Sequence, residues 1–176
     1  MKCLMKKIVL NIFLFCNIVV VISPATAYAK GKLPQPVFDH RAWKLSWSEN
    51  RDGNRFEEYT LKQETVENWS ELVTMQFFKG NYNALKFAQG MKQILKKSCP
   101  NAGFSIVSND KDINSVIWTF QVSDCPGQKN QLEIARAVVV PHVGIHVFHY
   151  ATTNLALSEK NFKAWVNNLL KIKISN

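Results

Sequence analysis

Alternating hydrophobic and polar residues predict a β-hairpin early in the chain. In the interval 41–48 every second residue is large and apolar, so these residues would share one face of a strand. They are Trp43, Leu45 and Trp47. An Asp-Gly pair within 51–54 is typical of a turn, and residues 55–61 can return as the partner strand.

The same alternation predicts a third strand at 69–78, where Val73, Met75 and Phe77 would share a face. Residues 65–68 could instead begin a helical turn, and we predict a short turn followed by the strand. Proline and glycine in the interval 141–144 indicate a bend between two later strands. The later strands are predicted at 104–108, 114–123, 131–140 and 145–151.

Two segments have the apolar spacing of amphipathic helices. The interval 81–98 places residues such as Ala84, Ala88 and Leu95 on one face, with Asn81 or Asn83 available as the N-cap. Pro100 ends this helix. Ser158 caps a second helix, whose apolar face consists of Phe162, Trp165, Val166, Leu169 and Leu170.

The order of elements predicts an α+β fold. Consecutive strands joined by short turns favour a mostly antiparallel β-sheet. The two amphipathic helices would pack on this sheet, and we expect that both could cover the same face.

The N-terminal segment has the features of a secretory signal peptide. Lysines precede an apolar run at 8–22, and the small-residue sites 25–27 and 27–29 follow it. We expect cleavage after Ala29, then an extended lead-in at 30–40 and a single domain at 41–176. An uncleaved anchor is disfavoured because the run is short for a membrane span, which needs about 20 residues. Acylation at Cys16 is disfavoured because Phe15 precedes it.

Cleavage would leave Cys99 and Cys125 as the cysteines of the mature chain. An even number of cysteines in an exported protein favours a disulfide. Free thiols or half of a zinc site are the alternatives, but no second cysteine pair remains. On the chain-entropy relation, closing this loop would stabilise the fold by about 3 kcal/mol. The bond would join the end of the first helix to the end of the Trp118 strand.

Composition and charge narrow the class of protein. The chain has 176 residues, of which 47% are hydrophobic, and this excludes a disordered chain. Loss of three signal lysines lowers the formal net charge from +9 to +6. The basic residues are spread, and the densest group is Lys92, Lys96 and Lys97 with Lys171 and Lys173. We favour a solvated basic face, with weak attraction to anionic envelope surfaces as the functional alternative, and no nucleic-acid signature is present.

His142, His146 and His149 are weak candidates for metal ligands, with His40 elsewhere in the chain. In a continuous strand His142 and His146 would share a face about 13 Å apart, which is too far for one metal ion. His149 would point to the other face. We therefore favour no metal site and expect no cofactor.

Motifs for catalysis or phosphate binding are absent from the sequence. Glu57 and Glu58 are adjacent carboxylates, but neighbours on a strand point to opposite faces. The sequence therefore favours a protein without catalytic residues.

Aromatic residues are numerous, and Trp43, Trp47 and Trp69 are candidates for a groove that binds a ligand or partner. For Trp43 and Trp47 we favour a place in the core, and the groove is the alternative. If their strand lies at the sheet edge, it could also accept an added strand.

The Trp43-x-Leu45-x-Trp47 pattern, the hairpin before the first helix and the segment 67–74 resemble small, uncharacterised exported bacterial proteins. The order of elements over residues 40–172 is also similar to the PsbP-like α/β sandwich. This resemblance implies a fold and an exported, non-enzymatic role, and it assigns no functional residue.

Together these features favour a non-catalytic binding or accessory protein of the cell envelope or extracellular space. Its partner would be a protein, a peptide or an apolar ligand, and we expect no membrane span after cleavage. The alternative is a small hydrolase or metal-dependent enzyme that uses the region from His142 to His149.

Overall fold

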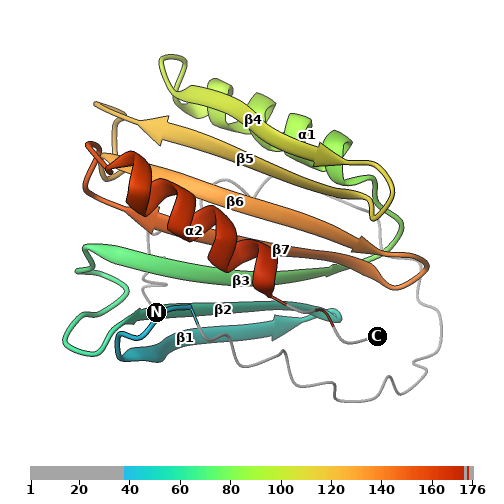
Figure 1. Cartoon of the computed structure of the whole chain (residues 1–176), viewed down its shortest axis with the longest axis horizontal. Helices are drawn as coiled ribbons and strands as arrows, with labels where there is room; N and C mark the ends of the chain where they lie inside the picture. The colour runs from blue at the N-terminus through green and yellow to red at the C-terminus, as the bar shows by residue number, and fades with distance from the viewer. Residues whose placement is uncertain (1–37, 173, 175–176) are drawn as a thin grey trace, which may run out of the picture.

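The computed structural model describes residues 38–172 and 174, and within them a single antiparallel sheet is flanked by two helices. The expected signal peptide, most of the lead-in and Lys173 lie outside these residues. The elements are β1 (Trp43–Arg51), β2 (Asn54–Leu61), β3 (Glu71–Lys79), α1 (Ala84–Ser98), β4 (Gly103–Asp110), β5 (Ser115–Val122), β6 (Gln131–Val140), β7 (Gly144–Thr152) and α2 (Glu159–Lys171). The seven described strands are ordered β1-β2-β3-β7-β6-β5-β4 (Figure 1).

The predicted α+β class and the antiparallel sheet are confirmed. The helices begin at capping residues that the sequence predicts. Asn83 caps α1 and Ser158 caps α2 through their side-chain oxygens. The β6–β7 bend also lies where it was expected. At this bend a Cβ on Gly144 would approach the Phe78 carbonyl oxygen to 2.3 Å, so the position has room only for glycine.

The expectation that both helices could cover one face is wrong, because they lie on opposite faces of the sheet (Figure 1). We call these the α1 face and the α2 face. The α1 face carries Trp118, Ala135 and Val147, whereas the α2 face carries their neighbours Ile117, Ile134 and Phe148. Since β5, β6 and β7 are apolar at successive positions, both of their faces need a covering layer.

The expectation that Trp43, Leu45 and Trp47 share a face is also wrong. A β-bulge between Leu45 and Trp47 shifts the pairing, so Leu45 lies opposite Tyr59 and Trp47 lies opposite Glu58. An extra residue in one strand reverses the alternation beyond it. Trp43 and Leu45 therefore face α2, and Trp47 faces the opposite side.

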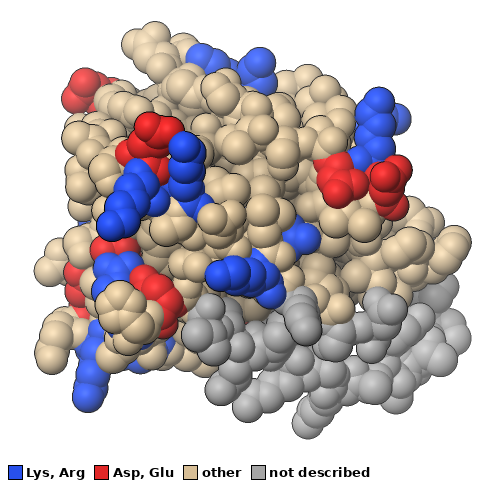
Figure 2. Space-filling model, in the orientation of Figure 1, with Lys and Arg blue, Asp and Glu red and all other residues tan. Residues whose placement is uncertain are grey.

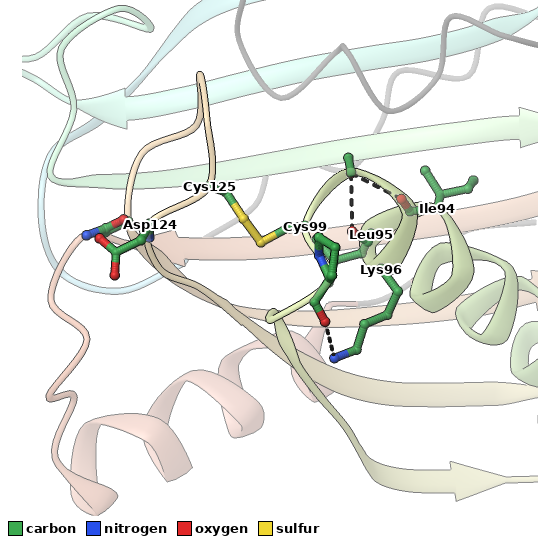
Figure 3. Close-up of a disulfide and its surroundings, with 9 residues drawn as sticks. Ile94, Leu95, Lys96, Cys99, Asp124 and Cys125 are labelled. Atoms are coloured by element: carbon green, nitrogen blue, oxygen red, sulfur yellow. Dashed lines mark hydrogen bonds between the residues drawn. A yellow bond between two sulfur atoms is a disulfide. The ribbon is translucent and has the colours of Figure 1, made fainter.

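The Cys99–Cys125 disulfide is present, with 5.6 Å between the Cα atoms (Figure 3). Cys99 is the C-cap of α1, and Cys125 follows the end of β5 at Val122. Both cysteines are buried in the core between α1 and the sheet. The bond therefore fixes the end of α1 against β5, as the sequence predicts.

We expect Cys99→Ser to lower the free energy of unfolding by about 3 kcal/mol under oxidising conditions, because the unfolded chain loses its cross-link. Urea unfolding of the oxidised wild type and the variant would measure this loss. In a reducing buffer the two proteins should unfold at nearly the same urea concentration. An equal loss under both conditions would contradict a stabilising disulfide.

Candidate functional site

A row of side chains crosses the α1 face at the centre of the sheet. Directly opposed residues of antiparallel strands share a face, so the pairing identifies the row from strand to strand. From β1 to β5 the row consists of Trp47, Glu58, Thr74, His149, Ala135 and Trp118. Glu58, Thr74 and His149 place three polar side chains next to one another on β2, β3 and β7, and all three are buried.

Three polar atoms on this face are buried without a hydrogen-bond partner among the described residues. They are Gln76 Oε1, Trp118 Nε1 and His149 Nε2. Gln76 belongs to the next row, opposite Val147 of β7. Two further unpartnered atoms lie elsewhere, at Glu64 in the loop after β2 and at His146 on the α2 face. A buried polar atom without a partner costs about 1–3 kcal/mol, so such atoms on one face mark a place where another molecule could supply partners.

His149 is held by a second buried polar residue. The Glu133 carboxylate contacts Nδ1 of His149, and the two side chains are 3% and 8% exposed. The Trp118 ring stands edge-on to the imidazole, with 5.9 Å between the ring centroids. When Nδ1–H of a neutral ring donates to Glu133, Nε2 is left as an acceptor. The contact therefore fixes the ring and leaves one nitrogen for another group.

Glu58 adds a titratable group to the row. Burial, and secondarily the negative charge of Glu67, raise the pKa of Glu58 to about 7. At neutral pH its carboxyl group is therefore present in both protonation states. It can donate a hydrogen bond in one state and accept in the other.

The structure does not bring the three candidate tryptophans together. Trp43 lies on the α2 face, edge-on to Trp165 with 6.0 Å between ring centroids. Trp69 belongs to a separate buried cluster with Leu72 and Ala151. Trp47 alone of the three lies in the row on the α1 face.

The histidines are also separated. His142 is an exposed turn residue with a φ of 63°, and His146 faces the α2 side, where its ring lies near Phe77 and Phe148. His149 faces the α1 side, and His40 is exposed near the start of the described chain. Within residues 38–172 and 174, no group of three or more metal-binding side chains is present.

Sequence reasoning missed Glu133 and Gln76. Each is a buried polar residue on a strand whose residues are mostly apolar. A buried charged residue is rare unless it is paired, so Glu133 and Arg136 in the otherwise mostly apolar interval 131–140 were usable signals. The contact between Glu133 and His149 could not be predicted, because it depends on the pairing of β6 with β7.

Comparisons with known proteins give a family match and a similarity to a solved structure. A family model matches residues 32–175 of this chain. A comparison with curated proteins gives no match. Among solved structures, the chain is similar to cyanobacterial PsbP (CyanoP) from Synechocystis sp. PCC 6803 in its solution structure, at 12% identity and a TM-score of 0.36. The alignment covers 84% of this chain and 94% of that one.

Among the residues that the structure describes, no helix is both long and apolar enough to span a membrane.

We expect Glu58→Gln to become more stable than the wild type as the pH rises. The folded pKa is above the ordinary value, so the fold favours the protonated form, and the wild type loses stability between about pH 4.5 and pH 7. The difference should grow to at most about 3 kcal/mol at pH 8. Urea unfolding at pH 4 and pH 8 would measure it.

Glu159→Gln removes an exposed carboxylate on α2 and controls for the change in net charge. A Glu58→Gln effect of equal size at both pH values would argue against a buried, titrating carboxyl group.

Proposed function

We propose that this chain, which belongs to the family whose model spans residues 32–175, is a non-catalytic binding protein that works outside the cytoplasm. Its ligand would lie on the α1 face of the sheet, against the row that runs from Trp47 to His149. The proposal rests chiefly on one observation: Gln76, Trp118 and His149 each leave a buried polar atom without a partner on this face, within the described chain.

The three atoms indicate the chemistry of the ligand. Gln76 Oε1 accepts hydrogen bonds, Trp118 Nε1–H donates, and His149 Nε2 accepts in the neutral ring. A matching molecule therefore carries both donors and acceptors, as an amide or a hydroxyl-bearing compound does. Trp47, which is partly exposed at the β1 end of the row, adds an aromatic surface beside the polar groups.

Export is the second part of the proposal. The lysines and the apolar run before Ala29 favour secretion, and the Cys99–Cys125 disulfide favours an oxidising compartment. Both the periplasm and the extracellular space satisfy these conditions.

A second candidate function, a small hydrolase, is favoured by the Glu133–His149 contact. A carboxylate on Nδ1 orients an imidazole so that Nε2 can act as a general base. Among the described residues no side-chain hydroxyl donates to His149, so the nucleophile in such an enzyme would be water. Hydrolysis of a small ester that is lost in both His149→Gln and Glu133→Gln would favour this alternative.

We expect the protein purified from the envelope or medium of its own host to retain a small molecule in native mass spectrometry. The added mass should disappear in His149→Gln and in Gln76→Leu, because each variant removes a partner that the ligand needs. Extraction under denaturing conditions would then identify the compound.

His146→Gln is the matched control, since His146 is a histidine of the same strand that faces the opposite side. It should retain the added mass. A wild-type protein that carries no ligand, or an equal loss in the control, would refute this location for the site.

A further inference from the structure

The edge strand β4 carries a second surface, distinct from the proposed ligand site. β4 pairs with β5 on one side and is the last strand of the described sheet on the other. Apart from the half-buried Phe104, its residues are exposed, and Ile106 is 41% exposed. Exposed strand edges present unpaired backbone groups to which another extended chain can add.

The two edges of the sheet differ in their protection. β1 carries Lys44, Glu49 and Arg51, and charged residues on an edge discourage pairing with another chain. In β4 the residues from Gly103 to Asn109 include no charge. A β-bulge between Ile106 and Ser108 bends the second half of β4, so the regular part of this edge is Gly103–Ile106.

Helix α1 places positive charge beside this edge. Lys92 Nζ lies 5.8 Å from the centroid of the Phe104 ring, so this flank of α1 faces β4. Lys96 lies one turn further along the same flank and donates to the Pro100 carbonyl oxygen at 3.0 Å (Figure 3). The residues of α1 include no aspartate or glutamate.

The α2 face, in contrast, carries charged side chains of both signs. Figure 2 shows that lysine and arginine side chains on it lie interspersed with aspartate and glutamate. One such pair is Lys163 with Glu159, at 2.6 Å. In α1, by contrast, all the charged residues are lysines.

We propose that Gly103–Ile106 binds an extended, acidic segment of a partner protein as an added antiparallel strand. Phe104 and Ile106 face the α1 side, opposite Phe120 and Trp118 of β5. An apolar residue of the partner would pack beside Ile106. Acidic residues two and four positions further along the partner strand, towards the Gly103 end and on the same face, would reach Lys92 and Lys96.

The lysines argue against a second copy of this chain as the occupant. Pairing β4 with β4 about a two-fold axis would place Lys92 and Lys96 of both copies side by side. Like charges at an interface oppose association, whereas acidic side chains would neutralise them.

The probe is a short capped peptide, used with the full chain. In this peptide threonine alternates with one valine and then two glutamates, so the glutamates follow the valine on one face. Hydrogen exchange should show slower exchange of the Gly103–Ile106 amides when the peptide is added, and the effect should weaken as salt rises. A peptide with lysine in place of glutamate should have no effect. The double variant Lys92→Glu/Lys96→Glu should weaken binding about tenfold.

Lys62→Glu/Lys160→Glu is the matched control, because it changes the net charge equally on exposed lysines of other elements. It should bind the peptide as the wild type does. The proposal is overturned by an absence of binding, by equal binding of the lysine peptide, or by an equal loss in the control. Protection of β4 that depends on protein concentration alone would assign the edge to a second copy and would also overturn it.

Discussion

Both faces of β7 are buried, and this is the constraint on which the rest of the structure depends. β7 lies between β3 and β6, and nearly all of its residues are buried, so every polar side chain on it needs a partner or a neutral state. His146 is in the neutral state. Burial, with a contribution from Arg55, lowers its pKa to about 4, and it lies among aromatic rings as a neutral group. His149, on the other face, is held by Glu133 instead.

The α2 face shows how fully this fold can satisfy buried charge. Arg136 on β6 donates to the carbonyl oxygens of Leu169, Leu170 and Ile172, so its guanidinium caps the C-terminus of α2. Glu71 accepts from Arg41 and from the Tyr150 hydroxyl. His146 Nδ1 is the exception there. The grouped unpartnered atoms near His149 therefore contrast with careful pairing on the opposite side, which favours a ligand over loose packing.

The predictable part of this protein is the part encoded locally. Asn83 and Ser158 cap helices because their side chains bond to backbone a few residues away. The bulge at Leu45 could not be predicted, since an extra residue leaves the alternation of types unchanged while it reverses the face of Trp47. The Glu133–His149 contact depends on strand register, which the sequence of either strand does not specify alone.

The disulfide fixes the C-terminal end of α1 beside the end of β5. The apolar side of α1 packs over β5 and β6, and both cysteines belong to the same buried core. Two regions then lie on either side of α1. Toward the centre of the sheet is the polar row that includes Glu58, Thr74 and His149. Toward the edge is β4, with Lys92 above Phe104. The two proposed surfaces use different residues, so ligand binding at the polar row and strand addition at β4 need not compete.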